Sequence, residues 1–170
     1  MAKSINEAYH FCPLCGEKFQ KKEPDLLVCK SCGFHYFINP RPCNAAIISD
    51  EKGNILLVKR KYEPKKDFWD LPGGFMSPDE NIDVSAKREI REELGVEIEI
   101  TGIVGGFADS YEYQGIVYPT YTTIVAAKII KGEIRPTDDV SDVAFYTKEE
   151  VFQLNIAFPS LLGAVRVYFS

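Results

Sequence analysis

Short apolar runs separated by turn residues fill most of the chain after residue 42. Their length and their content of Val, Ile, Phe and Tyr predict β-strands over residues 43–49, 54–60, 97–104, 105–113, 117–130 and 143–146. Residues 50–53 and 114–115 have the composition of tight turns. Helical spacing of the apolar residues predicts helices over 82–94, 148–154 and 160–168. The chain therefore mixes both kinds of element.

The helix predicted over 82–94 carries an apolar stripe and an acidic cluster. Apolar residues recur every four positions, at Ile82, Ala86, Ile90 and Leu94. Glu89, Glu92 and Glu93 stand at i, i+3 and i+4, so they are neighbours on an arc beside that stripe. Like charges this close cost about 0.2–0.5 kcal/mol per pair on an exposed helix. A hard divalent cation would relieve the repulsion. The alternative is a solvated acidic face balanced by Arg88 and Arg91.

The segment before this helix, Leu71-Pro72-Gly73-Gly74, favours the first interpretation. A Pro-Gly-Gly turn can adopt positive φ angles and brings backbone oxygens close to a ligand. Gly95 stands where a helix of this length would end in a left-handed residue. The loop and the helix together therefore predict one site for a cation.

The 23 residues from Gly74 to Val96 read Gly-x5-Glu-x7-Arg-Glu-Ile-x-Glu-Glu-x-Gly-Val. This segment resembles the Nudix box, and every defining position is filled. The resemblance implies the α/β class, with an α/β/α sandwich on a mixed sheet. It also implies a hydrolase that uses Mg²⁺ or Mn²⁺, with more than one ion, to cleave a pyrophosphate bond in a nucleoside diphosphate linked to a second group.

The resemblance also assigns roles to residues of the box. Glu89, Glu92 and Glu93 are the expected metal ligands, together with the carbonyl of Gly73. Glu92 and Glu93 are also expected to be catalytic. Glu80 and Arg88 are expected to orient the cluster, although a purely structural ion pair is the favoured interpretation for Arg88.

The general base is left open between two places in the sequence. It is either Glu92 or Glu93, or a carboxylate just before the strand 143–146. Asp139 and Asp142 are available there. Family members often have Glu in that region, so the presence of Asp leaves the choice undecided.

Four of the five cysteines lie in two Cys-x2-Cys pairs, Cys12/Cys15 and Cys29/Cys32, which are separated by 13 residues. This is close to the spacing of a Cys₄ zinc ribbon. Two disulfides or a redox pair are the alternatives, and both are rare in a reducing compartment. We therefore predict structural zinc, which a segment of about 40 residues needs in order to fold.

Length and charge divide the chain of 170 residues in two. We predict a zinc ribbon over 1–40 and a Nudix hydrolase domain over 41–170. The first 42 residues carry six Lys or Arg and four Asp or Glu, and the remainder carries 14 and 21, so the net charges are +2 and −7. An acidic body argues against nucleic acid as the main partner. No apolar run is long enough to cross a membrane and no signal peptide is visible, so we predict a cytoplasmic protein.

The substrate is less well marked than the chemistry. The SQPWPFPxS segment of the zinc-containing NADH pyrophosphatases is absent after Val96. The compact layout and the ending 145–160 are similar to FAD/ADP-ribose pyrophosphatases. This resemblance implies ADP-ribose, FAD or a related dinucleotide. Aromatic residues stack on bases, and strand-end cations meet phosphates, so Trp69, Tyr113 and Arg60 are the candidate substrate contacts.

Two other functions are compatible with the same sequence. One is a nucleotide-sensing regulator in which the ribbon contacts a partner. The other is a pyrophosphatase that removes RNA 5′ caps. The ribbon itself could complete the substrate pocket, support a homodimer, or only stabilise the N-terminal segment.

Overall fold

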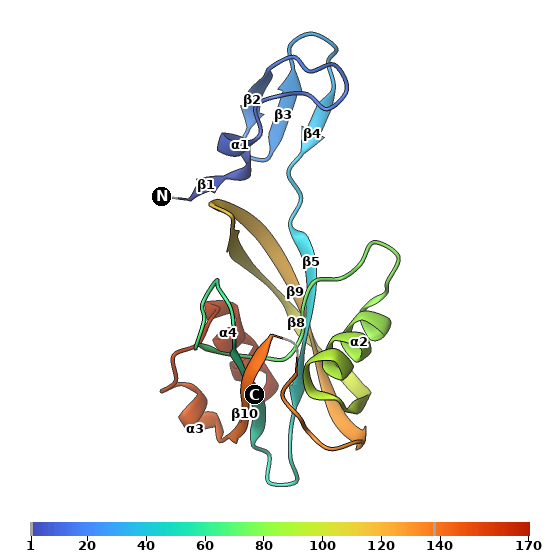
Figure 1. The fold of residues 1–170 in the computed structure, drawn as a ribbon, viewed down its shortest axis with the longest axis vertical. Helices are drawn as coiled ribbons and strands as arrows, with labels where there is room; N and C mark the ends of the chain where they lie inside the picture. The colour runs from blue at the N-terminus through green and yellow to red at the C-terminus, as the bar shows by residue number, and fades with distance from the viewer. Residues whose placement is uncertain (1, 138) are drawn as a thin grey trace. The chain divides into compact units, whose positions relative to one another are not determined.

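The computed structural model describes residues 2–137 and 139–170. Figure 1 shows the order of its elements. In chain order they are β1 (Lys3–Ser4), α1 (Ile5–Ala8), β2 (Phe19–Glu23), β3 (Leu26–Cys29), β4 (His35–Phe37), β5 (Arg41–Ile48), β6 (Ile55–Arg60), β7 (Trp69–Asp70), α2 (Ile82–Leu94), β8 (Glu97–Tyr113), β9 (Ile116–Lys131), β10 (Val140–Tyr146), α3 (Lys148–Val151) and α4 (Pro159–Tyr168).

The chain separates into two compact units. One comprises residues 1–41 with 110–120, and the other comprises 42–109 with 121–170. The division into domains at residues 40 and 41 stays a prediction, since the tip of the long β8–β9 hairpin groups with the first unit.

The first unit has a small interior. Strands β2, β3 and β4 form an antiparallel sheet in the order β2-β3-β4. Apart from two cysteines, its buried apolar side chains are Ile5 and Leu27, which are 7% and 1% exposed. So few apolar groups bury little surface, as is typical of small domains that rely on a metal or another cross-link.

The second unit is a sandwich built by alternation along its strands. In β5, Ala46 and Ile48 pack on the same side as Ala86, Ile90 and Leu94 of α2. Ala45 and Ile47 face the opposite way, toward Leu161, Ala164 and Val165 of α4. Because successive side chains of a strand point to opposite faces, this one apolar run supplies both cores. Figure 1 shows α2 and α4 on opposite sides of β5.

Pairing within the described residues is both parallel and antiparallel. Strand β1 pairs in parallel with β9, which also neighbours β5 and β8. Strand β6 lies antiparallel between β10 and β7. The expected mixture of helices and a mixed sheet is therefore present.

Some predicted bounds are wrong. Strand β10 begins at Val140 rather than at residue 143, so it includes Asp142, and helix α3 ends at Val151 rather than at residue 154. Residues 97–113 form the single strand β8 rather than two strands that divide at Gly105. The strand continues through Gly106, where the absence of a side chain leaves space for Tyr121. A Cβ there would come within 2.6 Å of the ring of Tyr121 on β9. The predicted hairpin turn at Gln114 and Gly115 is confirmed, with φ angles of 50° and 75°.

Candidate active site and metal centres

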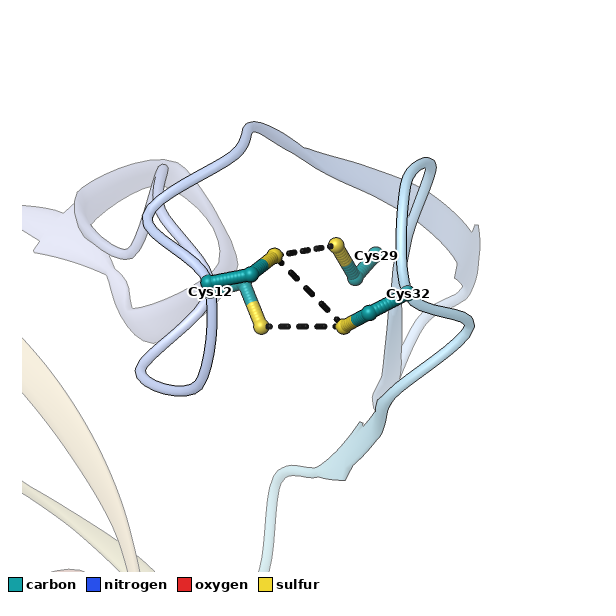
Figure 2. A group of neighbouring side chains, drawn as sticks. Cys12, Cys29 and Cys32 are labelled. Carbon is teal, nitrogen blue, oxygen red and sulfur yellow. Dashed lines mark hydrogen bonds between the residues drawn. The ribbon is translucent and has the colours of Figure 1, made fainter.

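The four thiols of the ribbon converge. The Sγ atoms of Cys12 and Cys32 are 3.7 Å apart, those of Cys15 and Cys29 are 3.4 Å apart, and those of Cys15 and Cys32 are 3.5 Å apart. All four sulfurs lie within 4.8 Å of one another. Figure 2 shows the side chains of Cys12, Cys29 and Cys32 pointing toward one another.

Two tight turns bring the cysteines to this position. Gly16 and Gly33 each follow a second cysteine, and both have a φ angle of 74°. Their N–H groups donate to the carbonyls of Cys12 and Cys29, at 2.9 and 3.2 Å. The backbone N–H of Cys32, followed by that of Ser31, helps to lower the pKa of the Cys29 thiol to about 6. This favours the thiolate, which is the form that binds metal.

The sulfur spacing distinguishes between the alternatives. All five cysteines are free. Four sulfurs at the corners of a tetrahedron with Zn–S bonds of about 2.3 Å would be about 3.8 Å apart. The observed separations of 3.4–3.7 Å are near this value, whereas a disulfide requires about 2.05 Å. The cluster is therefore compatible with zinc and not with two disulfides.

Helix α2 presents its three glutamates at three depths. The helix begins after Asn81, whose side chain accepts from the N–H of Val84, and ends at the left-handed Gly95, as predicted. Glu93 is only 6% exposed. The side chains of Glu89 and Glu92 are 16% and 50% exposed. The arc beside the apolar stripe therefore faces the interior at Glu93 and solvent at Glu92.

The Pro-Gly-Gly loop lies along β5. The carbonyls of Pro72 and Gly74 accept from the N–H groups of Ala46 and Asn44, each at 2.9 Å. The intervening Gly73 donates its N–H to Oε2 of Glu93 at 2.9 Å. No described residue donates a hydrogen bond to the Gly73 carbonyl. The loop thus contacts the buried end of the glutamate cluster and leaves one oxygen available.

Both glycines of this loop lie in close contact with neighbouring atoms. Gly73 has a φ angle of 146°, and a Cβ there would come within 2.6 Å of the Cα of Ala45. A Cβ on Gly74 would come within 2.7 Å of Cδ and Oε2 of Glu89. At Gly74 the loop forms a cradle for the Glu89 carboxylate, which would have to move if this position carried a Cβ, whereas at Gly73 the backbone of β5 leaves no space for one.

Arg88 connects the acidic residues of the helix. Its Nε and Nη2 donate to the two carboxylate oxygens of Glu80 at 2.6 and 2.8 Å. Its Nη1 donates to Glu89 Oε1 at 2.6 Å and to Glu92 Oε2 at 3.0 Å. The guanidinium also reaches the carbonyl of Phe75 at 3.3 Å. Glu80 and Arg88 thus contact the acidic cluster, and their orienting and catalytic roles stay predictions.

Glu93 lacks such a counter-charge among the described residues. Burial, and next the charge of Asp139, raise the pKa of Glu93 well above its ordinary value. Burial also raises the pKa of Glu89, against the opposing effect of Arg88. The hydrogen bond from Gly73 only partly offsets the burial of Glu93. A cation beside these carboxylates would favour their charged forms.

The two candidate aspartates lie in different surroundings. Asp139 is close enough to Glu89 and Glu93 for its charge to raise the pKa of both. The side chain of Asp142 instead accepts from the N–H of Val143 at 2.9 Å, and it lies 3.9 Å from Nζ of Lys59. The structure therefore associates Asp139, and not Asp142, with the glutamate cluster.

Of the predicted substrate contacts, Arg60 and Trp69 lie on the paired strands β6 and β7, and Tyr113 belongs to the other compact unit. Arg60 donates to Pro64 O at 2.9 Å and to Asp70 Oδ2 at 3.1 Å. Trp69 is 8% exposed and packs edge-on against Tyr146, with ring centroids 5.0 Å apart. Tyr113 is 53% exposed. The contacts of Arg60 and Trp69 are those of structural residues, and a substrate role for all three stays a prediction.

Sequence reasoning missed Asn44. Its side chain on β5 is 2% exposed and donates to Ser85 Oγ of α2 at 2.8 Å. The available signal was a polar residue inside an otherwise apolar strand.

The donor set of the helix fits a hard divalent cation. It consists of carboxylate oxygens and a carbonyl oxygen, which Mg²⁺ and Mn²⁺ prefer. Between Glu89 and Glu92 a positive group is already present, the Nη1 of Arg88. Among described residues, however, only the four cysteines place at least three ligand atoms within 4.8 Å of one another. The glutamates are thus less tightly gathered than the thiols.

Comparison with known proteins decides the family. The NUDIX domain model matches residues 39–162. The chain belongs to the NUDIX domain family. The family predicted from residues 74–96 is therefore confirmed, and so is the α/β fold class. The chain is a member of a hydrolase family, and enzymes of this family generally use divalent metals.

Two relatives and one solved structure illustrate the similarity. An ADP-ribose pyrophosphatase of Methanocaldococcus jannaschii is 30% identical over 135 residues, which are 78% of this chain and 76% of that protein. The NAD-capped RNA hydrolase NudC of Haemophilus influenzae strain PittGG is 30% identical over 96 residues. These are 54% of this chain and 36% of that protein. The crystal structure of a NUDIX hydrolase from Nitrosomonas europaea has a TM-score of 0.69 and 24% identity, and the match covers 93% of this chain and 89% of that one.

Among residues 2–137 and 139–170, no helix combines the length and the apolar character that crossing a bilayer would require.

Proposed function

We propose that this protein hydrolyses the pyrophosphate bond of an ADP-linked small molecule to two monophosphates, with ADP-ribose as the first substrate to test. The observation that carries this proposal is the buried Glu93, which accepts from Gly73 and lies near Glu89 and Asp139. Such a cluster of carboxylates suits a site that receives a cation together with a polyanionic substrate.

Glu89, Glu92, Glu93 and the carbonyl of Gly73 would hold Mg²⁺ or Mn²⁺. When bound, the ions neutralise phosphate charge and lower the pKa of water. Gly73 supports the position of Glu93 through its N–H, and Gly74 supports that of Glu89 by leaving it space. Arg88 would restrain Glu89 and Glu92 from the solvent side.

Asp139 is the better of the two aspartates as general base. Its backbone carbonyl accepts from the N–H of Lys61 at 2.8 Å, and the N–H of nearby Thr137 donates to the carbonyl of Glu93 at 2.9 Å. These bonds anchor the loop to β6 and to the end of α2. Asp139 would accept the proton of the attacking water. Glu92 and Glu93 remain the alternative bases.

The four cysteines would hold one structural zinc ion. All four positions are thiols, so a bound ion would have no open position for substrate. Its contribution would be to the folding of the ribbon, whose interior is too small to be stable without it.

The substrate class rests on the relatives and on the compact layout. The M. jannaschii relative is named an ADP-ribose pyrophosphatase, and this chain spans most of it. FAD is the second candidate. A second activity, release of a nucleotide from NAD-capped RNA, is favoured by the similarity to NudC, although only 36% of that protein is matched.

A substrate panel tests the proposal. The purified protein is incubated with Mg²⁺ or Mn²⁺ and with ADP-ribose, FAD, NADH, diadenosine polyphosphates, dNTPs and NAD-capped RNA, and the products are identified. We expect AMP and ribose 5-phosphate from ADP-ribose. Faster turnover of capped RNA than of any free dinucleotide would favour the second activity, and no turnover of any compound would refute both. Tight binding of ADP-ribose without hydrolysis would instead support a sensor.

A further inference from the structure

Asn44 is a buried polar residue at the junction of the three segments that build the site. It is 2% exposed and is followed on β5 by Ala45, Ala46, Ile47 and Ile48, which are all buried. An Asn in such a position needs partners for its amide, because water cannot reach it.

The side chain joins β5 to both parts of the box. Its Nδ2 donates to Ser85 Oγ of α2 at 2.8 Å and lies 3.4 Å from the carbonyl oxygen of Gly74. The backbone N–H of Asn44 donates to the same Gly74 carbonyl at 2.9 Å. One residue thus holds the strand, the glycine loop and the helix together.

The contact continues from Ser85 to the glutamates. Ser85 is 0% exposed, and its Oγ also lies 3.4 Å from Nη2 of Arg88. Arg88 in turn donates to Glu89 and Glu92. At its other end, Asn44 supports Gly74, whose missing Cβ leaves space for the Glu89 carboxylate.

This arrangement has a cost that core packing alone does not explain. The Oδ1 atom of Asn44 is buried and accepts no hydrogen bond from any described residue. A buried acceptor without a partner destabilises a fold, and an apolar side chain of similar size would avoid the loss. The presence of an Asn at this position is therefore best explained by the contacts of its Nδ2 group with Ser85 and with the carbonyl of Gly74.

We propose that Asn44 is a positioning residue that orients Glu89 and Glu92 for metal binding, through Ser85 and Arg88 on one side and Gly74 on the other. The inference rests on the proposed function. Asn44 does not itself bind metal or substrate. Outer hydrogen bonds of this kind typically change metal affinity or activity by about 10–100-fold.

The test compares Asn44→Ala with Asn54→Ala in the full chain. Asn54 undergoes the same chemical change, but its side chain bonds Asp50 in the turn between β5 and β6. Mn²⁺ is titrated without substrate by electron paramagnetic resonance, and thermal unfolding is followed in parallel. We expect Mn²⁺ affinity to fall about tenfold or more in Asn44→Ala and to stay at the wild-type value in Asn54→Ala. A lower melting temperature with unchanged Mn²⁺ affinity would mean a merely structural role and would overturn the proposal.

The variant Ser85→Ala and the double variant Asn44→Ala/Ser85→Ala test whether Asn44 acts through Ser85. If Asn44 acts mainly through Ser85, the double variant binds Mn²⁺ about as weakly as the weaker single variant. If the loss of Mn²⁺ affinity in the double variant equals the product of the two single losses, the two residues act independently and that route is overturned. Should Asn44→Ala fail to fold, Ser85→Ala carries the test, and wild-type Mn²⁺ affinity there would overturn the proposal.

The titration also separates this inference from the proposed function. A wild-type protein that binds Mn²⁺ but turns over no substrate would refute the function, while the affinities of the variants would still decide the role of Asn44. A wild-type protein that binds no Mn²⁺ would overturn both.

Discussion

The ribbon and the box helix both gather groups that can bind metal, but they do so to different degrees. The four thiols have converged to within 4.8 Å of one another. The three glutamates of α2 instead range from 6% exposed at Glu93 to half-exposed at Glu92, with Arg88 between two of them. Thiols carry no charge while they keep their protons, so they can approach one another even with a Cys29 thiolate among them. Carboxylates at neutral pH repel, so they need a cation to come together.

The difference also extends to what supports each group. The cysteines are positioned by two local turns, each of which is closed by the N–H of a glycine. The glutamates depend on β5, on the glycine loop and on the loop that contains Thr137 and Asp139. Loss of one cysteine should therefore abolish metal binding by the whole thiol cluster. Loss of one support of the glutamates should only weaken metal binding at α2, because the other segments remain in place.

The largest effect should come from the loss of one zinc ligand. We expect Cys29→Ser to lose its zinc and the β2–β4 sheet to lose its amide protection, because structural zinc contributes about 10–16 kcal/mol of apparent binding energy in zinc-finger peptides. Elemental analysis and hydrogen exchange measure both. Protection in β5 and α2 should persist. A variant that retained zinc and a protected sheet would contradict the Cys₄ assignment.

Glu93→Gln should produce the next largest effect. We expect kcat/KM to fall by about 10²–10⁴-fold, while the melting temperature without metal stays the same or rises. Stability should not fall, because the pKa of Glu93 is raised and the ionised carboxylate therefore opposes folding at neutral pH. Steady-state kinetics and thermal unfolding measure the two quantities. Glu99→Gln, an exposed position on β8, is the control. Undiminished activity would remove Glu93 from the mechanism.

Gly74→Ala tests the cradle for Glu89. A Cβ would come within 2.7 Å of the carboxylate, so we expect Mn²⁺ affinity to fall by roughly 10–100-fold. Gly102→Ala is the matched control, because a Cβ there meets nothing within 4 Å. Equal Mn²⁺ affinities in the two variants, measured by titration, would show that the loop does not shape the site.

Asp139→Asn and Asp142→Asn separate the candidate bases. We expect a loss in kcat of about 10²-fold for the first and a change of less than about threefold for the second, whose carboxylate lies near Lys59. Equal behaviour of the two variants would return the role of base to Glu92 or Glu93.

The smallest effect concerns acid stability. The two hydrogen bonds from Arg88 lower the pKa of Glu80 to about 2, from an ordinary value of 4.5. Because the folded-state pKa is depressed, this stabilisation is complete above the unfolded value and is lost as the pH falls from about 4.5 toward 2. Glu80→Gln should therefore be less stable than wild type at pH 7, with a smaller difference at pH 3. Urea unfolding at both pH values measures this, and a constant difference would contradict the ion pair.

The sequence alone determined the features that depend on local spacing. Residues 74–96 identified the family, the four-residue apolar period gave the bounds of α2, and the two Cys-x2-Cys pairs predicted thiols that converge. The bounds of the helix and the turn within each Cys-x2-Cys pair depend on neighbours a few residues away, where helical and turn geometry specify direction. Gly73 and Gly74 were recognised as close-approach residues for the same reason.

The tertiary structure alone decided which residues lie together from distant segments. It associated Asp139, not Asp142, with Glu89 and Glu93, and it engaged Arg60 with Asp70. It also placed Asn44 of β5 against Ser85, across 41 positions of the chain. The physical reason is that burial and long-range hydrogen bonds depend on how strands and helices pack, and the spacing of residues within one segment carries no information about that packing.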